Sequence, residues 1–434
     1  MKRQFVAASV ATALALGLAA CGGAGAAKPA AHSADPTTVT GTLTVWLMND
    51  AQTSWPELVG QVNNEFAALY PNVSLRLSYQ SWADKVSKLD DALKQGGAPD
   101  VVELGNTETM KYILNGSLAQ VNHADYENSD SWIRGLENTC TYDDKLYCVP
   151  YYAGARVGIY NSAMFQQATG SADFPTTEDA LMSALDKVQA KYKDDRSFSP
   201  LYLPGPYWYA ALSYVAAYGG TVARFDSSGN WHGTLEDPKA QQGIQHFVDL
   251  VRKYNHGDLT VNELHQSGVL GKQKAAMIYG NGWEAADAAT APAGDPALNG
   301  VLKVVGMPGP NGKPLPSFIG GSDLAITAKS QVSTLASAWI KLFTSAKSEQ
   351  VLADKNILPN NLVQLAPLKE KPETAAAANA VPDAWFTPIA PGWGAVEKQN
   401  VLPDMLGAIL AGTSVADATK AADAKINQLI NSPS

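Results

Sequence analysis

Residues 96–106 read Gly-Gly-Ala-Pro-Asp-Val-Val-Glu-Leu-Gly-Asn. The two glycines end a run of helical spacing, and residues 100–104 form a short segment with an apolar centre. Such a segment is typical of a strand in the middle of a parallel sheet, which is covered on both faces. Glu103 and Asn106 lie at the end of this strand, where open α/β sheets bind ligands. We therefore expect both to bind a ligand; the alternative is that they cap the segment that follows.

On either side of this stretch, strand patterns alternate with helix patterns. Short β-rich or apolar segments predict strands at 42–48, 73–79, 157–160, 275–279, 301–306 and 325–327. Longer, helix-like segments predict helices at 56–70, 82–95, 177–192, 240–254, 333–344 and 408–430. Strands that alternate with helices in this way indicate an α/β protein.

The composition indicates a folded, acidic protein. The chain has 434 residues, of which 46% are hydrophobic, and a formal net charge of −9. This length predicts two or three domains with substantial cores. A nucleic-acid partner would require a clustered basic surface, and the 32 lysines and arginines form no such run. We therefore expect no nucleic-acid partner.

The first 41 residues have the pattern of an export signal followed by a tether. A positively charged start precedes an apolar run that is too short to remain as a membrane-spanning helix. Residues 18–23, Leu-Ala-Ala-Cys-Gly-Gly, resemble a bacterial lipobox, in which the cysteine is lipidated and becomes the new N-terminus. We predict a signal peptide at 1–20, a lipid on Cys21 and a flexible tether at 21–41. The alternative is an ordinary signal peptide in which Cys21 occurs by chance.

The other two cysteines, Cys140 and Cys148, lie on either side of the turn-like sequence Asp143-Asp144-Lys145. Outside the reducing cytosol, this pattern predicts a hairpin whose arms are joined by a disulfide. A redox or metal pair is the alternative, but two cysteines with no histidine close by do not make a zinc site. We predict no metal site.

Signatures of catalysis are absent from the sequence. It has no Gly-x-Ser-x-Gly motif. Residues 309–313 lack the spacing of a phosphate-binding loop, and Pro314 stands where such a loop requires Ser or Thr. The 6 histidines are scattered. We therefore predict neither an enzyme nor a bound cofactor; a glycosidase pair of carboxylates is the alternative that the sequence leaves open.

Several aromatic residues occur where the chain is expected to turn. Trp82 follows a strand, and Trp393 stands between two glycines. Tyr207 and Trp208 follow a Pro-Gly-Pro turn, and Trp283 closes the sequence Tyr-Gly-Asn-Gly-Trp. Glycine-rich loops lie on the surface, where a large flat ring can stack on the apolar face of a sugar ring. The alternative is that these rings are hydrophobic plugs that cap the sheet.

In their order and spacing, the sequence motifs resemble those of the extracellular solute-binding proteins of ABC-type sugar importers, the maltose-binding-protein-like class. The resemblance covers nearly the whole chain after the signal. Besides residues 96–106, it rests on Leu-Thr-Val-Trp-Leu-Met at 43–48, Glu-Phe at 65–66, Tyr-Pro-Asn-Val at 70–73, Asp-Lys-Leu-Tyr-Cys-Val-Pro-Tyr at 144–151, Tyr-Gly-Gly at 218–220, Gly-Lys-Gln-Lys-Ala-Ala-Met at 271–277, Gly-Trp at 282–283 and Phe-Ile-Gly-Gly-Ser at 318–322.

The resemblance implies a two-lobed α/β fold of the periplasmic-binding-protein type (type II), with the lobes joined by a hinge and the ligand in the cleft. The lobes would be 42–153 plus 305–356 and 157–300 plus 360–434, with hinges near 153–157, 300–305 and 356–360. The ligand-binding residues implied by matching positions or by the motifs are Trp82, Glu103, Asn106, Tyr207, Trp208, Asn281, Trp283, Gly320, Gly321, Ser322 and Trp393.

The resemblance also implies the function and the partners. The protein would bind a sugar, with a disaccharide or short oligosaccharide favoured and a monosaccharide possible, and deliver it to ABC permease subunits. It would act as a monomer on the extracellular face of the cell membrane, held there by its lipid. The alternatives are a secreted carbohydrate-active enzyme, or the same fold with a non-sugar solute such as glycerol phosphate or a peptide.

Overall fold

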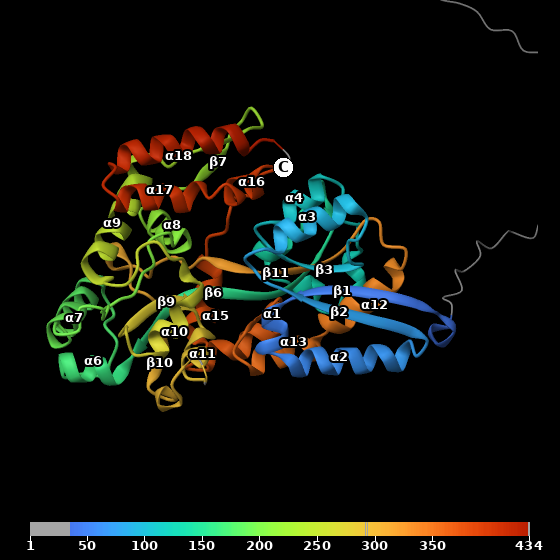
Figure 1. Ribbon diagram of the computed structural model, residues 1–434, viewed down its shortest axis with the longest axis horizontal. Coiled ribbons are helices and arrows are strands. Elements are labelled where there is room, and N and C mark those ends of the chain that lie inside the picture. The colour runs from blue at the N-terminus through green and yellow to red at the C-terminus, as the bar shows by residue number, and fades with distance from the viewer. Residues whose placement is uncertain (1–34, 291, 293, 433–434) are drawn as a thin grey trace, which may run out of the picture.

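The computed structural model describes residues 35–290, 292 and 294–432 (Figure 1). The predicted signal peptide at 1–20, the lipidation site Cys21 and most of the predicted tether at 21–41 lie outside the described residues. Within the described part of the chain, no helix has both the length and the apolar character needed to cross a membrane.

An eight-stranded sheet forms the centre of the molecule. Its strands are β1 (Gly41–Met48), β2 (Val73–Gln80), β3 (Val101–Gly105), β6 (Val149–Asn161), β9 (Met277–Asn281), β10 (Leu302–Val305), β11 (Ile319–Ile326) and β12 (Leu358–Pro359). The order is β10–β6–β11–β3–β1–β2, and β9 and β12 also pair with β6. Strand β3 is parallel to β1 but antiparallel to β11. The predicted parallel sheet is therefore found on only one side of β3, because the chain returns through β11 in the opposite direction.

Strand β6 runs through both halves of the molecule (Figure 1). Its first part pairs with β11 and β12, and its last part pairs with β9 and β10. Residues 153–157, predicted as a hinge, lie within this strand, and Ile319 of β11 pairs there with Ala155. Strands β6 and β11 thus connect the two lobes.

Two large hydrophobic clusters fill the two lobes. One contains residues from 43–152 and 324–357, and the other contains residues from 160–315 and 390–430. A smaller cluster lies at the middle of β6 and includes residues of α14 (Leu362–Leu365) and α15 (Ala375–Ala380). Helices α14 and α15, which the sequence assigned to the second lobe, therefore pack at the junction.

Helices cover both faces of the first-lobe strands (Figure 1). They are α1 (Asn49–Thr53), α2 (Pro56–Leu69), α3 (Lys85–Gln95), α4 (Thr109–Leu114), α5 (Arg134–Cys140), α12 (Ser333–Phe343) and α13 (Ala346–Asp354). Helix α2 begins at Pro56, whose fixed φ suits the first helical position, and it buries Leu58 and Phe66. The helix predicted at 82–95 begins only at Lys85, so Trp82 lies in a turn before it.

The second lobe packs its helices around β9, β10 and the end of β6. They are α6 (Ser162–Thr169), α7 (Glu178–Lys191), α8 (Trp208–Ala217), α9 (Pro238–Tyr254), α10 (Gln266–Gly271), α11 (Glu284–Ala288), α16 (Trp393–Lys398), α17 (Val401–Leu410) and α18 (Val415–Leu429). The single helix predicted at 408–430 is wrong. The chain turns at Gly412, which has a φ of 114°, and Ser414 caps α18 by accepting a hydrogen bond from the Asp417 N–H.

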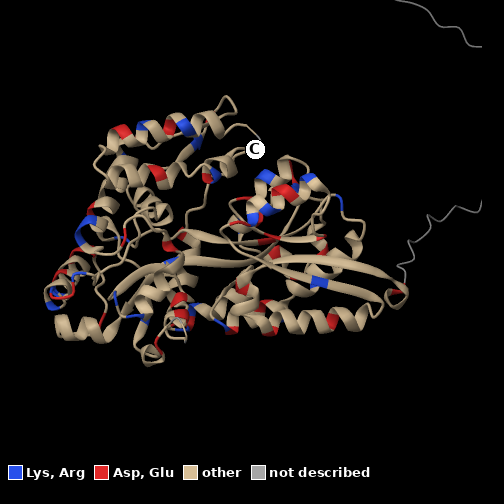
Figure 2. Ribbon diagram, in the orientation of Figure 1, with Lys and Arg blue, Asp and Glu red and all other residues tan. Residues whose placement is uncertain are grey.

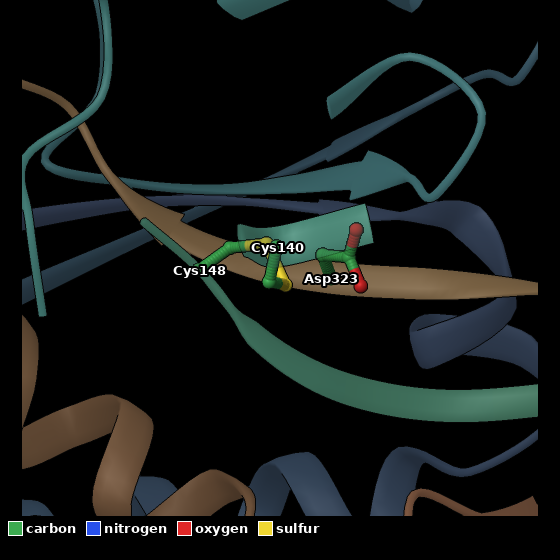
Figure 3. A group of neighbouring side chains, drawn as sticks. All are labelled: Cys140, Cys148 and Asp323. Carbon is green, nitrogen blue, oxygen red and sulfur yellow. A yellow bond between two sulfur atoms is a disulfide. The ribbon is translucent and has the colours of Figure 1, made fainter. Parts of the chain in front are cut away.

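The predicted hairpin and its disulfide are present. Strands β4 (Thr141–Tyr142) and β5 (Lys145–Leu146) pair antiparallel around Asp143 and Asp144, both with positive φ. A disulfide joins Cys140 to Cys148, with their Cα atoms 5.0 Å apart. Figure 3 shows Asp323 of β11 beside this bond. The three side chains do not form a metal site, because disulfide sulfurs are not thiolates.

Candidate ligand-binding cleft

A cavity of about 380 Å³ lies between the two lobes. The start of α1 and the turns after β2 and β3 line it from the first lobe, and the crossing strands β6 and β11 form its floor. Helices α8 and α11, the start of α10 and the segment before it line it from the second lobe. Its lining residues are Asp50, Trp82, Gly105, Asn106, Thr107, Glu108, Tyr152, Gly154, Arg156, Tyr209, Glu263, Leu264, Ser267, Asn281, Trp283, Glu284, Asp287, Phe318, Gly320 and Gly321. A solute in this cavity would contact both lobes at once.

The first-lobe wall is built around Trp82. The indole Nε1 of Trp82 donates a hydrogen bond to the carboxylate of Asp50. The Lys85 ammonium lies 4.1 Å from the Trp82 ring centroid and 2.6 Å from Glu108 Oε2. Gly105 gives these groups room, since a Cβ there would lie 3.2 Å from Lys85 Nζ and 3.4 Å from Trp82 Cζ3. The Trp82 ring is thus held at the cavity by contacts on its edge and on its face.

Trp283 follows strand β9 and lies against the crossing strand β6. A Cβ on Gly154 of β6 would lie only 2.6 Å from Trp283 Cη2 and 2.7 Å from Asn281 Oδ1. Tyr152 packs edge-on against the Trp283 ring, with 6.2 Å between ring centroids. The absence of a side chain at residue 154 is therefore what lets Trp283 and Asn281 approach the cavity floor together.

Arg156 of β6 connects the floor to the second lobe. Its Nε donates to the Tyr207 hydroxyl at 2.9 Å, and its Nη1 donates to Asn281 Oδ1. The guanidinium also lies over the rings of Tyr209 and Phe318, at 5.2 Å and 5.6 Å from their centroids. These two rings stack on each other at 4.5 Å. Arg156 thus fixes the amide of Asn281 and an aromatic surface beside it.

A second, wider cavity of about 1000 Å³ adjoins the first and shares Trp82, Tyr209, Glu263 and Leu264 with it. Trp208 lies on its wall, together with residues from α17. Near its edge, the lobes touch through α16. The Thr107 hydroxyl donates to Glu397 Oε2 at 3.0 Å, and Lys398 Nζ lies 3.3 Å from Asp90 Oδ2.

The cavity lining is more acidic than the outer surface. Acidic and basic residues are interspersed over the outer helices of both lobes (Figure 2). The lining instead has one arginine and five carboxyl groups, at Asp50, Glu108, Glu263, Glu284 and Asp287. Burial raises the pKa of Glu284 to about 7, although its carboxylate accepts hydrogen bonds from Asn281 N and Gln266 Nε2.

Over residues 61–399, the sequence matches the family described as bacterial extracellular solute-binding protein. The chain belongs to this family. A relative from Streptomyces coelicolor, the diacetylchitobiose binding protein DasA, is 32% identical over 434 residues, which cover 99% of each chain. The family places this solute-binding protein outside the cytoplasm.

Solved structures share the two-lobed α/β fold of this solute-binding protein. The GacH receptor of Streptomyces glaucescens, solved unliganded and with acarbose, matches with a TM-score of 0.75 and 22% identity, over 90% of this chain and 99% of that one. A solute-binding protein of an ABC transporter from Thermotoga lettingae, bound to α-D-tagatose, matches with a TM-score of 0.76 and 21% identity, over 90% and 100%.

The structure brings about half of the candidate residues of this solute-binding protein to the first cavity. Those on its wall are Trp82, Asn106, Asn281, Trp283, Gly320 and Gly321, and Trp208 lines the second cavity. Glu103, Tyr207, Ser322 and Trp393 are buried and line neither cavity. A ligand-binding role for these four residues stays a prediction.

Each of the four has a structural partner or position that explains its burial. Glu103 Oε2 accepts from the Met48 N–H at 2.7 Å, across to the neighbouring strand β1, and Ser322 is buried on β11. Tyr207 accepts from Arg156. Trp393 belongs to the second-lobe core and donates from Nε1 to Glu397 at 2.6 Å. The burial of Tyr207 and Trp393 thus agrees with the alternative interpretation, in which the aromatic residues are hydrophobic plugs that cap the sheet.

The sequence did not identify several residues of the lining. Tyr209 belongs to the aromatic run after the Pro-Gly-Pro turn, and it reaches the cavity from the first turn of α8. Phe318 precedes β11 and stacks on Tyr209. Asp50, Glu263 and Asp287 lie in short segments with no motif, so only the fold shows that they face the same space.

Proposed function

We propose that this solute-binding protein is the carbohydrate-binding subunit of an ABC importer and not an enzyme. The observation that carries the proposal is the pair of indoles, Trp82 from the first lobe and Trp283 from the second, on the wall of one interlobe cavity. The same cavity is lined by Asn106 and Asn281, whose amide groups can both donate and accept hydrogen bonds. Aromatic faces and such polar groups together suit a sugar ring.

The proposed ligand is a disaccharide or short oligosaccharide, with a monosaccharide possible. The relative DasA, 32% identical, is named for a disaccharide, and GacH was solved with acarbose. A phosphate ester would need more than one arginine, and Arg156 is the one arginine in the lining. Glycerol phosphate is therefore a weaker candidate.

The proposed mechanism is a shift between an open and a closed arrangement of the lobes. A sugar that contacts both walls stabilises the closed arrangement, which then docks on permease subunits while a separate subunit hydrolyses ATP. A lipid on Cys21 would hold the protein, as a monomer, on the extracellular face of the membrane. Replacement of Cys21 by serine should then release the protein from the membrane fraction into the medium, as fractionation and immunoblotting would reveal.

A thermal-shift screen followed by calorimetry tests the binding function. We expect one or more mono- or oligosaccharides to raise the melting temperature and to bind with one site per chain, whereas glycerol phosphate and short peptides leave the melting temperature unchanged. Chromatography of the same mixtures checks for products. Sugar turnover would establish the enzyme alternative, and a shift with peptides alone would identify a different solute.

A further inference from the structure

The space between the lobes continues beyond the first cavity. The first cavity, of about 380 Å³, is near the lower end of the roughly 300–1,000 Å³ that pockets for small ligands occupy. The second cavity, of about 1000 Å³, shares Trp82, Tyr209, Glu263 and Leu264 with it. The two cavities are therefore parts of one groove, and a chain that fills the first would extend into the second between Trp82 and Tyr209.

A strip of aromatic rings leads from the first cavity into the second. Phe318 lines the first cavity, Tyr209 lines both, and Trp208 lines the second. The ring centroids of Phe318 and Tyr209 are 4.5 Å apart, and those of Tyr209 and Trp208 are 3.8 Å apart. Successive sugar rings can pack their apolar faces along such a strip, because each aromatic ring offers a flat apolar surface.

One face of α17 forms a wall of the second cavity. Helix α17 lies beside α8, which carries Trp208 and Tyr209 (Figure 1). The wall residues of α17 and its flanks recur at a helical spacing of three or four, and they include Asn400, Pro403, Asp404, Gly407 and Leu410. Gly407 stands in the middle of this face, and a Cβ added there would meet no atom within 4 Å. The wall is therefore open at its centre.

The second cavity offers both apolar surface and free polar groups. Leu259 and Leu264 line it with 37% and 52% of their surface exposed. The side chains of Asn400 and Asp404 are also exposed, and neither takes part in a hydrogen bond or ion pair with another of the described residues. An amide and a carboxylate can both accept hydrogen bonds from hydroxyl groups, and the amide can also donate. This combination suits a sugar ring, which has an apolar face and a rim of hydroxyls.

We propose that the second cavity binds further rings of the same ligand, so that the preferred ligand is an oligosaccharide of more than two rings. This inference rests on the proposed sugar-binding function and specifies the length of the sugar. The added rings stack on Trp208, and their hydroxyls form hydrogen bonds with Asn400 and Asp404. An apolar group attached to a short sugar would cover Leu259 and Leu264 but would leave these polar side chains without partners.

Oligosaccharides of one to five rings test this inference by calorimetry with the full mature chain. The probes are three series: β-1,4-linked N-acetylglucosamine, β-1,4-linked glucose and α-1,4-linked glucose. In the series that binds, affinity should rise about tenfold or more from two rings to four, because the added rings gain stacking and hydrogen bonds. A longer chain also gains a few-fold because it contains several disaccharide units, so a rise of only that size contradicts the proposal.

Two variants locate the added rings in the second cavity. Gly407→Leu places a side chain in the opening of the α17 wall and should remove most of the gain between two and four rings. Gly60→Leu makes the same change on the exposed side of α2, where an added Cβ also meets no atom within 4 Å, and should retain the full gain. Trp208→Ala should lose the gain as well, and its melting temperature records any cost to the second-lobe core.

The outcomes separate this inference from the sugar-binding function. Equal affinity for two and four rings overturns the inference and leaves the function standing, and so does a gain that survives both cavity variants. Tighter binding of the phenyl glycoside of the disaccharide, with no gain from further rings, would overturn it in favour of an apolar group. Failure of every sugar to bind would refute both.

Discussion

At the residue scale, the cleft depends on where side chains are missing as much as on where they are present. Gly154 on β6 and Gly105 at the end of β3 each leave space that an indole and its neighbours occupy. Trp82 and Trp283 reach the cavity because of this, whereas Trp393, also beside glycines in the sequence, is only 1% exposed and belongs to a core. A glycine next to a tryptophan therefore does not by itself distinguish a binding ring from a buried one.

The Trp283→Ala variant should lose sugar affinity by more than about 1 kcal/mol, because stacking of an aromatic ring on a sugar face is lost. The melting temperature of the free protein should change little, since Trp283 is only partly buried at the cavity. Calorimetry and thermal unfolding measure the two quantities. Phe225→Ala, at an exposed ring of the second lobe, is the control that should leave affinity unchanged. Lost stability with intact affinity would make Trp283 a structural plug.

The Gly154→Ala variant should weaken sugar binding about tenfold or more. The added Cβ would lie 2.6 Å from Trp283 Cη2 and 2.7 Å from Asn281 Oδ1, so both groups must move from the cavity floor. Crowding of this kind costs about 1–3 kcal/mol. Gly60→Ala in α2 is the matched control, because no atom lies within 4 Å of its added Cβ and alanine favours a helix. Unchanged affinity in Gly154→Ala would contradict the role given to this position.

At the scale of elements, the short helix α16 forms a contact between the two lobes. It begins at the second-lobe core residue Trp393, yet Glu397 and Lys398 at its end contact Thr107 and Asp90 of the first lobe. The sequence predicted no helix there. Its six residues give only a weak helix pattern in the sequence. Its position is set by Trp393, which lies in the second-lobe core, and by the contacts of Glu397 and Lys398 with the first lobe.

The Lys398→Glu variant should favour the open arrangement of the lobes, because a negative charge would then face Asp90. We expect sugar affinity to fall about two- to fivefold, the size expected for a half-exposed pair worth less than about 1 kcal/mol. Calorimetry measures the affinity, and small-angle scattering of the free protein should give a larger radius of gyration. Lys420→Glu makes the same charge change on the exposed side of α18 and should change neither the sugar affinity nor the radius of gyration. If the two variants behaved alike, the α16 contact would not be what stabilises the closed arrangement of the lobes.

At the scale of the whole molecule, buried carboxyl groups should make stability depend on pH. Burial raises the pKa of Asp323, beside the disulfide, and of Glu103 to about 7 each, from usual values of 3.8 and 4.5. Between these values the folded protein binds more protons than the unfolded chain, so stability falls as pH rises toward about 7 and then levels off. Acidification from pH 7 toward pH 5 should therefore increase the contribution of these two groups to the free energy of unfolding.

Denaturant unfolding of Asp323→Asn at several pH values checks this effect. The variant should lose part of the pH dependence, on the order of 1.4 kcal/mol for each unit of pKa shift, and the contribution of Glu103 should remain. Asp383→Asn, at an exposed position, should retain the full dependence of the unsubstituted protein. A slope unchanged by the Asp323 substitution would mean that this carboxyl group titrates alike in the folded and unfolded chain.

The sequence by itself determined the α/β class, most of the long elements, the hairpin with its disulfide and the family. These depend on local chemistry: the spacing of apolar residues, turn residues and the order of short motifs. It also indicated Trp82, Asn281 and Trp283, which stand beside turns at strand ends.

Only the tertiary structure decided which residues share the cavity. Asp50, Arg156, Glu263 and Asp287 are far apart in the chain and have no common pattern, and they meet because β6 and β11 cross between the lobes. The same crossing places β11 antiparallel to β3. The tertiary structure also decided which side chains are buried. Glu103, Tyr207, Ser322 and Trp393 are buried because parts of the chain that are distant in sequence pack over them.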